Sequence, residues 1–403
     1  MRILQINSIV NLESTGRIAE DIGKVLIANG HESYIAYGRS NRPSQSKLIK
    51  IGNKYDFYQH AVLTRLTDRH GFGSKQATLN LIKEIETIRP NAIGLHNIHG
   101  YYINIEVLFD YLAEKEIPVL WTLFDCWSFT GHCAYFDKIG CEKWLTKCHH
   151  CPQIRNYPAS FYIDNSERNF ADKKNIFNSL PKMELIAHSH WLSGLVSKSF
   201  LNKIPIHTIP SGIDLSLFKP IQSEIKERMG IEHSKKIVLG VASPWSKRKG
   251  LDDFHLLRQQ LSDDYTIVLV GLTAKQKKAL QPNMIGIERT DSVQELAELY
   301  SVADVFVNPT YQDNFPTTNI ESLACGTPVI TYNTGGSPEA IDKDTGFVVE
   351  KGDIKGLVAA VANVIKKGKE HYQPLCRTRA ENCFNKDERY LEYLNLYEQL
   401  MKR

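Results

Sequence analysis

The stretch VFVNPTYQDNFPTTNIESLACGTPVIT, residues 305–331, contains a strand, a loop, a helix and a second strand. An apolar run comes first, and a polar loop with Asp313 follows it. The pattern then predicts a helix that begins near Thr317 and stops at Gly326, before a second apolar run starts at Pro328. Two short apolar runs joined by a helix are typical of a βαβ unit with parallel strands.

The same alternation runs along most of the chain. Before Pro220, the strand-like runs are Arg2–Ile6, Ser33–Ala36, Ile93–His96, Val119–Thr122, Glu184–Ala187 and Ile206–Ile209. After Pro220, they are Ile237–Val241, Thr266–Val270, Val305–Asn308 and Pro328–Thr331. Helix-period stretches separate these runs, which predicts parallel βαβ units. We therefore expect an α/β fold of two Rossmann-like, doubly wound domains that face each other across a cleft.

Proline and glycine mark the boundary between the two expected domains. The cluster consists of Pro205, Pro210, Gly212 and Pro220, which places a hinge near residues 213–220. We expect an N-terminal domain at 1–212, with a Cys-rich loop at 126–160, and a C-terminal domain at 213–386. Residues 387–403 are expected to form an amphipathic helix that can pack back on the N-terminal domain. Its apolar stripe is predicted at Tyr390, Leu391, Leu394, Tyr397 and Leu400.

Composition limits the class of protein. The 403 residues are 42% apolar, which is enough for a large core. The 49 basic and 45 acidic residues leave a net charge of +4 without long basic runs, which argues against a nucleic-acid-binding protein. No uncharged apolar stretch approaches the roughly 18 residues of a membrane span, and Met1–Val10 lacks the pattern of a signal peptide. We therefore expect a cytoplasmic protein that can be peripheral at the inner face of the cell membrane.

Two carboxylates in the opening stretch suggest a ligand site. The N–H groups and the dipole of a helix that begins near Thr317 form a seat for a phosphate group. Glu321 lies about one turn further along, on the same face as Thr317 and Thr318, where it can accept two hydrogen bonds from a ribose diol. Asp313 either holds the preceding loop or meets the sugar ring. The alternative is that Glu321 is a solvated helix residue and Asp313 a turn former.

Several motifs point to the same kind of ligand. They are Asp313-x7-Glu321, Ala324-Cys-Gly-Thr-Pro328, Gly335-Gly-Ser-Pro-Glu339, Ser189-His-Trp-Leu192, Ile209-Pro-Ser-Gly-Ile-Asp-Leu-Ser-Leu-Phe-Lys-Pro220 and Lys249-Gly250. Together they resemble the nucleotide-sugar signature of retaining glycosyltransferase family 4, in its polysaccharide-biosynthesis type with a Cys-rich loop. The first carboxylate of that signature is commonly Glu, whereas this chain has the shorter Asp313.

The resemblance implies a GT-B fold, a nucleotide-diphosphate sugar donor held mainly by the C-terminal domain, retention of anomeric configuration, and no catalytic divalent metal. Lys249 matches the family lysine that clamps the departing diphosphate, and Arg248, or else Lys247, is expected to replace the family arginine. Asp313 and Glu321 complete the expected catalytic set. The expected donor contacts are Lys247, Asn314, Phe315, Pro316, Thr317, Thr318 and Glu321. The alternative for residues 247–249 is an exposed basic turn.

The N-terminal domain is expected to contribute a second group of residues. Gly16 lies between the first strand and a helix, where a missing Cβ lets the backbone approach a sugar or phosphate. Asp125 follows a strand, and the resemblance places it near the donor. In many relatives a histidine precedes this aspartate, whereas this chain has Phe124. Three histidines that can take its place, and that are otherwise structural, are His96, His99 and His132.

Five of the eight cysteines lie between Cys126 and Cys151. Four of them follow the pattern Cys133-x7-Cys141-x6-Cys148-x2-Cys151, in a segment without clear periodicity. Four thiolates with one Cys-x2-Cys pair can hold a tetrahedral structural zinc ion, which would order such a loop. His149, His150 or Cys126 can replace one ligand. The alternative is a set of reduced, buried cysteines.

A Gly-rich basic loop, Asp68-Arg-His-Gly-Phe-Gly-Ser-Lys75, lacks the ending of a P-loop. With Arg39, Arg42 and Arg65 nearby in sequence, it can face an anionic lipid-diphosphate acceptor, or it is a solvated surface. The leading hypothesis is a transferase that adds a sugar to a glycan or lipid-linked oligosaccharide acceptor in surface polysaccharide biosynthesis. The alternatives are a nucleotide-sugar epimerase or hydrolase on the same fold and a non-catalytic nucleotide-sugar-binding protein.

Overall fold

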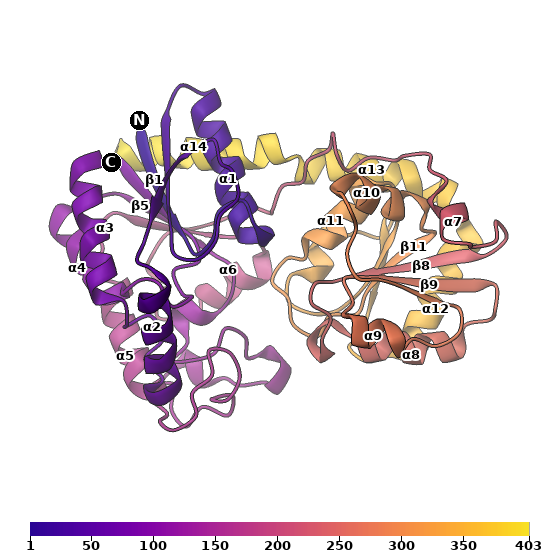
Figure 1. The fold of residues 1–403 in the computed structure, drawn as a ribbon, viewed down its shortest axis with the longest axis horizontal. Coiled ribbons are helices and arrows are strands. Elements are labelled where there is room, and N and C mark those ends of the chain that lie inside the picture. The colour runs from indigo at the N-terminus through magenta and orange to yellow at the C-terminus, as the bar shows by residue number, and fades with distance from the viewer. Residues whose placement is uncertain (403) are drawn as a thin grey trace. The chain divides into compact units, whose positions relative to one another are not determined.

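The computed structural model describes residues 1–402, which fold as two α/β units (Figure 1). Unit 1 consists of residues 1–209 together with the C-terminal segment from residue 387, and unit 2 consists of residues 210–386. Each unit has its own parallel sheet and its own core. The α/β class and the parallel sheets predicted from the sequence are therefore confirmed.

Unit 1 contains seven strands. Its elements are β1 (Arg2–Asn7), α1 (Glu13–Ala28), β2 (Glu32–Tyr37), β3 (Lys47–Lys50), α2 (Lys54–Thr67), α3 (Lys75–Ile88), β4 (Ala92–Leu95), α4 (Ile105–Lys115), β5 (Val119–Leu123), η1 (Trp127–Phe129), η2 (Asp137–Ile139), η3 (Lys143–Leu145), α5 (Ser166–Phe177), β6 (Met183–Ala187), α6 (His190–Val196), β7 (Ile206–Thr208) and, at the C-terminus, α14 (Lys386–Met401). The strand order is β3-β2-β1-β4-β5-β6-β7, and all neighbours are parallel.

The two faces of this sheet are covered by different helices because successive side chains of a strand point to opposite faces. Ile3 packs with α1 and α14, whereas the next residue, Leu4, packs with α3 and α4. Leu120 and Trp121 divide in the same way on β5. Continuous apolar strands of this kind are typical of a parallel sheet that is buried on both faces.

The C-terminal helix α14 packs in unit 1. Its buried side chains are Tyr390, Tyr393, Leu394, Leu396, Tyr397 and Leu400, which lie against Ile3, Ile18 and Ile22. The predicted stripe was wrong at Leu391, which is 42% exposed. The buried face is therefore rotated toward Tyr393, whose hydroxyl lies 3.5 Å from Thr122 Oγ1 on β5.

Unit 2 contains six strands. Its elements are α7 (Ile225–Arg228), β8 (Lys236–Val241), η4 (Lys247–Lys249), α8 (Leu251–Gln260), β9 (Tyr265–Val270), α9 (Ala274–Lys278), β10 (Met284–Ile287), α10 (Val293–Val302), β11 (Val305–Asn308), α11 (Thr317–Ala324), β12 (Val329–Tyr332), η5 (Ser337–Ala340), β13 (Gly346–Val349), α12 (Ile354–Lys367) and α13 (Lys369–Phe384). The strand order is β10-β9-β8-β11-β12-β13, again all parallel.

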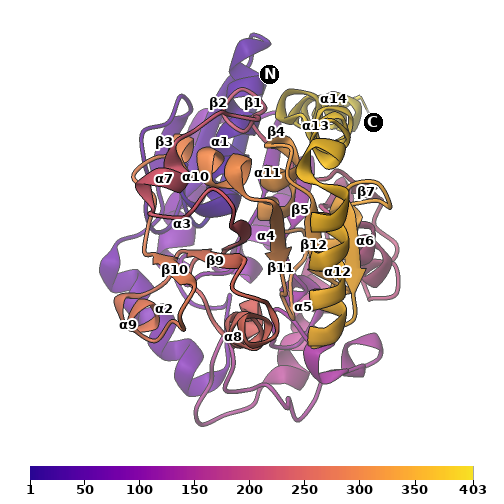
Figure 2. The ribbon, with the colours of Figure 1, turned by 90° about the vertical axis from the view of Figure 1, so that its right-hand side faces the viewer.

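The helices of unit 2 also form two layers. Figures 1 and 2 show α10 and α11 on one side of the strands and α8 and α9 on the other. The predicted helix from Thr317 to a stop at Gly326 is confirmed, since α11 ends at Ala324 and Gly326 has a φ of +77°. This left-handed conformation is one that glycine adopts without strain.

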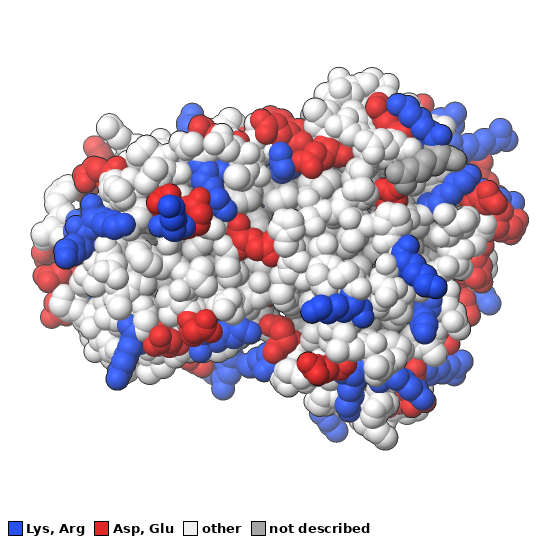
Figure 3. Space-filling view, turned by 180° about the vertical axis from the view of Figure 1, so that it is seen from behind, with Lys and Arg blue, Asp and Glu red and all other residues white. Residues whose placement is uncertain are grey.

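Within residues 1–402, none of the helices combines the length and apolar content that a transmembrane span requires. On the face drawn in Figure 3, basic and acidic side chains are interspersed. That face therefore presents no continuous basic surface of the kind that nucleic-acid-binding proteins use.

Candidate functional site

The strand order of unit 2 identifies where a ligand can bind. β8 and β11 are neighbours, but the chain leaves β8 toward β9 and returns at β11, so the order reverses between them. The loop after β8 leads to α8 on one face of the sheet, and the loop after β11 leads to α11 on the other. Open α/β sheets bind ligands at the carboxyl ends of the strands next to such a reversal.

Lys249 and Asp313 meet at this edge. Lys249 ends η4 after β8, and Asp313 lies in the loop after β11. The ammonium group of Lys249 donates a hydrogen bond to the Asp313 carboxylate, and both side chains stay partly exposed. The two residues are therefore close together although 64 positions separate them in sequence.

Arg248 links the loop after β8 to the loop after β11 through hydrogen bonds. Its guanidinium Nη1 donates to the Gln312 carbonyl at 2.5 Å, and its own carbonyl accepts the Tyr311 N–H at 2.8 Å. Lys247, by contrast, is exposed and forms no ion pair with the described residues. Arg248 thus positions the loop that carries Asp313, while Lys247 leaves its charge at the surface.

Gly250 allows the two loops to approach each other. It follows Lys249, has a φ of +77°, and a Cβ built on it would lie 2.2 Å from the Pro309 carbonyl oxygen. A larger residue would strain the backbone and push the loops apart. The pairing of Lys249 with Asp313 therefore depends on glycine at position 250.

The residues between Asp313 and α11 divide into buried and accessible groups. Asn314, Phe315 and Pro316 are buried, and the Phe315 ring packs 5.8 Å from that of Phe384 in the core of unit 2. Thr317 and Thr318 are half-buried at the start of α11. No side chain caps the start of this helix, so its first backbone N–H groups remain available to bind an anion.

Glu321 is buried rather than solvated. Glu321 lies in the second half of α11 and is 6% exposed, and its Oε2 accepts a hydrogen bond of 2.9 Å from the Tyr300 hydroxyl of α10. Burial, together with the charge and the hydrogen bond of Glu321, raises the pKa of Tyr300 well above its ordinary value. The alternative of a solvated helix residue is therefore wrong. A buried carboxylate kept in place by a tyrosine is suited to recognise a polar group.

A buried polar network fixes the strand ends around Glu321. Asn308 Nδ2 donates to Asn319 Oδ1 at 2.8 Å, and Asn319 Nδ2 donates to the Ser337 carbonyl at 3.1 Å. The hydroxyls of Ser337 and Thr331 lie 2.6 Å apart. These hydrogen bonds join the carboxyl ends of β11 and β12 to α11 and η5.

In unit 1, Gly16 lies inside the first turn of α1, because that helix begins at Glu13 rather than after Gly16. The predicted boundary was therefore wrong by one turn. A Cβ at Gly16 would lie 3.2 Å from Ile9 Cγ1 and 3.1 Å from Asn11 N. Glycine here allows the loop after β1 to pack tightly against the helix.

Asp125 follows β5, and both of its carboxylate oxygens are engaged. Oδ1 accepts the Trp127 N–H at 2.9 Å, and Oδ2 lies 3.0 Å from His99 Nε2. The other ring nitrogen of His99 lies 3.2 Å from the Tyr157 hydroxyl. Because β4 and β5 are adjacent, the loops that follow them bring His99 and Asp125 together at the carboxyl edge of the sheet.

The other two candidate histidines are deeply buried. His96 bonds to Gln5 at 2.8 Å, and burial lowers the pKa of His96 to about 3, so the ring is neutral. His132 bonds to Asp68 in the interior. Burial works against charging this ring, but the hydrogen bond and charge of Asp68 raise the pKa of His132 overall. Of the three, only His99 pairs with Asp125.

The four cysteines of the predicted zinc site line one cavity of about 20 Å³. A hydrogen bond joins the thiols of Cys133 and Cys151, and Cys148 Sγ accepts the Gly131 N–H at 3.2 Å. Across residues 1–402, however, no group of three or more His, Cys, Asp or Glu side chains has an arrangement that could hold a metal ion. The geometry of the described residues therefore gives no support to the zinc prediction for Cys133, Cys141, Cys148 and Cys151.

The basic residues near the Gly-rich loop are largely engaged. Arg69 pairs with Asp172 at 2.6 Å and lies 3.5 Å over the Phe72 ring. Arg39 lies over the ring of Phe57. Arg39, Arg42 and Arg65 nevertheless remain exposed, so the segment keeps cations at its surface.

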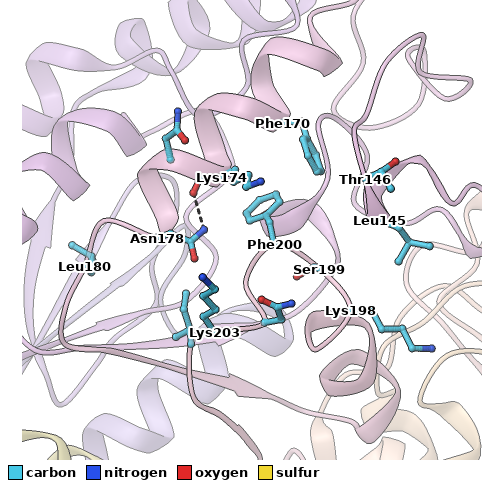
Figure 4. A pocket seen from close by; sticks show the side chains of 13 residues that line it. Leu145, Thr146, Phe170, Lys174, Asn178, Leu180, Lys198, Ser199, Phe200 and Lys203 are labelled. Atoms are coloured by element: carbon cyan, nitrogen blue, oxygen red, sulfur yellow. Dashed lines mark hydrogen bonds between the residues drawn. The ribbon is translucent and has the colours of Figure 1, made fainter.

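A cavity of about 840 Å³ lies elsewhere in unit 1, between α5 and the segment that precedes β7 (Figure 4). Phe170 and Phe200 meet in it with ring centroids 5.1 Å apart, and Lys174, Lys198 and Lys203 lie around them. Leu180 and Ile204 place it near the amino ends of β6 and β7. None of the predicted site residues lines it, so its volume alone does not make it the functional site.

Sequence comparison finds a family model for part of the chain. Residues 235–367, which include β8, α11 and β12, match the family model described as glycosyl transferases group 1. Most of unit 2 is thus similar to the group 1 glycosyltransferases. The chain is 24% identical over 374 residues to the putative colanic acid biosynthesis glycosyl transferase WcaC of Escherichia coli (strain K12), covering 89% of each chain.

A second relative of this chain is the N,N'-diacetylbacillosaminyl-diphospho-undecaprenol alpha-1,3-N-acetylgalactosaminyltransferase of Campylobacter jejuni. The two are 27% identical over 264 residues, which cover 60% of this chain and 69% of the relative. Among solved structures, Alr3699/HepE of Anabaena in complex with UDP superposes with a TM-score of 0.69 at 14% identity, over 99% of this chain and 100% of that one. The same protein has also been solved with UDP-glucose, with a TM-score of 0.66. This likeness confirms the GT-B fold.

Sequence reasoning missed several residues that build the candidate site of unit 2. Tyr300, Asn319 and Ser337 hold Glu321 and the strand ends, and no spacing rule singled them out. Asn319 and Ser337 do lie within two of the motifs, and both are short polar residues. Buried polar residues in such positions need a partner, which is the signal that would have identified them.

Proposed function

We propose that this glycosyltransferase transfers a sugar from a nucleotide-diphosphate sugar to a glycan or lipid-linked oligosaccharide in surface polysaccharide biosynthesis, with retention of anomeric configuration. The observation that carries the proposal is the ion pair of Lys249 with Asp313, in the loop that leads from β11 to α11, the helix that also carries the buried Glu321. A cation, an uncapped helix start and a buried carboxylate on that helix match the parts of a nucleoside diphosphate. The UDP and UDP-glucose complexes of Alr3699/HepE support a donor of this class.

Each residue then has a part. Glu321 accepts hydrogen bonds from the ribose hydroxyls, and the start of α11, with Thr317 and Thr318, receives the phosphates. Lys249 stabilises the charge that develops on the diphosphate as its bond to the sugar breaks. Asp313 holds Lys249 at the edge, and Arg248 holds the loop that carries Asp313.

The proposed reaction is a front-side displacement. The acceptor oxygen forms the new bond on the face of the sugar from which the diphosphate leaves, and an oxygen of the leaving diphosphate takes the acceptor proton. The protein therefore has to orient the reactants and stabilise charge, and it needs no nucleophile of its own. Asp125 with its partner His99 is the polar pair that unit 1 offers to the reaction.

The acceptor class is supported by the relatives. The Campylobacter jejuni enzyme is named for a diphospho-undecaprenol substrate, and the Escherichia coli protein for colanic acid biosynthesis. We propose an acceptor of the same broad class for this chain, with the reaction at the cytoplasmic face of the membrane.

A thermal-shift screen tests the donor site. A ligand that binds only the folded protein raises its apparent stability, so the matching nucleotide-diphosphate sugar should raise the melting temperature of the wild type. Glu321→Ala should lose this response, whereas Glu232→Ala, which removes an exposed carboxylate of the same unit, should keep it. Equal responses of both variants would contradict the proposal. Products of turnover with an acceptor, analysed by NMR for the anomeric configuration, then distinguish retention from inversion, and transfer from hydrolysis or epimerisation.

A further inference from the structure

The cavity of about 840 Å³ in unit 1 lies outside the proposed donor site (Figure 4). Its lining comes from three segments of the chain, within residues 145–146, 170–180 and 198–204. We call it the α5 cavity, because the middle segment includes the second half of α5. Its volume lies within the range of about 300–1,000 Å³ that small-ligand sites occupy.

Two phenylalanine rings form an apolar wall of the α5 cavity. Phe170 on α5 is 5% exposed, and its ring meets the ring of Phe200 edge to face, at an angle of 85°. Phe200 is only half-buried, so part of its ring stays accessible. The turn around it is tied by Ser199, whose hydroxyl donates to the Val196 carbonyl at 2.8 Å and accepts the Leu201 N–H at 3.1 Å. An accessible ring in such a turn offers a fixed apolar surface to a ligand.

Three lysines line the same cavity, and none of its lining residues is Asp or Glu. Lys174, Lys198 and Lys203 are exposed, and among the described residues their ammonium groups have no carboxylate, hydrogen-bond acceptor or aromatic ring as a partner. Lys174 and Lys198 lie near the carboxyl ends of α5 and α6, where a positive charge is favourable, but Lys203 has no such place.

The two carboxylates of α5 are paired with other cations. Glu167 lies 2.7 Å from the ammonium group of Lys147, and Asp172 lies 2.6 Å from the guanidinium group of Arg69. Neither carboxylate lines the α5 cavity. The lysines of the cavity therefore keep a positive charge that attracts an anionic ligand.

Amide side chains complete the lining. Asn175 and Asn202 are exposed, and their side chains form no hydrogen bond with the described residues. Each amide can both donate and accept, which suits it to hydroxyl groups. In Figure 4 the three lysines lie apart from one another around the two rings. Separate cations match charges that are spread along a chain better than they match a single phosphate group.

We propose that the α5 cavity binds an acidic saccharide, a segment of glycan whose sugars carry carboxylates. The apolar face of a sugar packs on Phe200, the amides bond to its hydroxyls, and the lysines meet its carboxylates. The cavity lies near the amino ends of β6 and β7, whereas Asp125 and His99 lie at the carboxyl edge of the same sheet. The bound segment is therefore distinct from the reacting end of the glycan. Its role as part of the acceptor rests on the proposed function, but the binding itself does not.

Isothermal titration of the full chain tests the binding. The probes are the tetrasaccharides of galacturonate, glucuronate and mannuronate, at about 0.05 M salt, where charge interactions are weakly screened. At least one should bind with a Kd of about 1 mM or less. Its methyl ester has the same sugars without the charges and should bind at least about tenfold more weakly.

Variants then place the binding in the α5 cavity. Lys198→Glu/Lys203→Glu should weaken binding of the acidic tetrasaccharide at least about tenfold, because it replaces two attractive charges by repulsive ones. The control Lys275→Glu/Lys278→Glu makes the same change of net charge on exposed lysines of unit 2 and should bind like the wild type. Phe200→Leu keeps an apolar side chain without the ring and should weaken binding about threefold or more. Thermal unfolding of each variant shows that it is folded.

Three outcomes would overturn the proposal. The first is that none of the three tetrasaccharides binds with a Kd below about 10 mM. The second is that Lys198→Glu/Lys203→Glu binds like the wild type, and the third is that the unit 2 control loses as much affinity, which would show unspecific attraction. Binding of inorganic phosphate or phosphatidylglycerol vesicles at these lysines, with no tetrasaccharide bound, would assign the cavity to a phosphate group instead.

The donor response keeps this proposal separate from the proposed function. Lys198→Glu/Lys203→Glu should show the same thermal shift with the donor as the wild type, since neither lysine belongs to the donor site. Absence of any donor response in the wild type would refute the proposed function, and the saccharide result would stand apart from it.

Discussion

The carboxylate of Glu321 has two roles, one in the stability of unit 2 and one in donor binding. It accepts a hydrogen bond from the buried Tyr300 hydroxyl, and we propose that it also binds the ribose of the donor. The variant Glu321→Ala removes both interactions at once. A loss of donor binding in this variant alone would therefore be open to a purely structural explanation.

The two effects have different sizes. An unpaired buried hydroxyl costs about 1–3 kcal/mol, so Glu321→Ala should destabilise unit 2 by this amount through Tyr300. A hydrogen bond to a charged group contributes about 1.5–3 kcal/mol, so the loss of two bonds to the ribose should weaken donor binding at least about 100-fold. The second effect acts on affinity and the first on stability.

The double variant Tyr300→Phe/Glu321→Ala distinguishes them. It removes the orphaned hydroxyl, so thermal unfolding should show part of the stability restored relative to Glu321→Ala. Isothermal titration with the donor should still show the loss of affinity. Tyr300→Phe alone should retain most of the donor affinity. Recovery of donor affinity in the double variant would refute a direct role of Glu321 in ribose binding.

Three further predictions concern unit 2. Lys249→Ala should lower kcat about 100-fold or more, because the lysine stabilises the charge that develops on the diphosphate, and it should cost little stability, because the side chain is partly exposed. Replacing the exposed Lys275 by Ala is the control and should leave kcat unchanged. If Lys249→Ala loses folding as much as activity, Lys249 is structural. Asn319→Ala should destabilise the unit by about 1–3 kcal/mol for each buried polar group that it leaves unpaired, measured by urea unfolding, and an unchanged midpoint would contradict this. Burial raises the pKa of Asp214, but its hydrogen bonds to Lys386 and Ser216 outweigh this and hold the pKa at about 2. The ionised Asp214 therefore contributes fully to the free energy of unfolding above about pH 4, and this contribution is lost as the pH falls toward 2. In Asp214→Asn, the free energy of unfolding should fall by about 1 kcal/mol less between pH 4 and pH 2 than in the wild type, after allowance for solvent screening. The same decrease in both proteins would refute this role of Asp214.

The strands could be predicted from the sequence except at three of the four sheet edges. All ten predicted strands are present with ends within one residue of the prediction. The three strands that were not predicted are β3, β10 and β13, and each lies at the edge of a sheet. Edge strands are short and half-exposed, as the pattern of Lys47–Lys50 shows, so they lack the continuous apolar run that identifies a central parallel strand.

The motifs predicted which residues belong to the candidate site, but they did not predict which side chains contact each other, because those contacts depend on the packing of the fold. The motif placed Glu321 on a helix after a strand, and the structure adds that it is buried beside Tyr300. Nothing in the spacing shows that Lys249 and Asp313 form an ion pair, because that contact depends on the order of strands in the sheet. Cysteine spacing suggested a metal centre, but spacing fixes neither the directions of the thiols nor their other partners.

The central claim is that the donor binds at the carboxyl edge of unit 2, and a crystal structure with the stabilising nucleotide-diphosphate sugar tests it most directly. The account predicts ribose hydroxyls within hydrogen-bond distance of Glu321. It also predicts the phosphates at the start of α11 and a contact between the diphosphate and Lys249. A donor bound elsewhere, with its ribose out of hydrogen-bond distance of Glu321, would contradict the account.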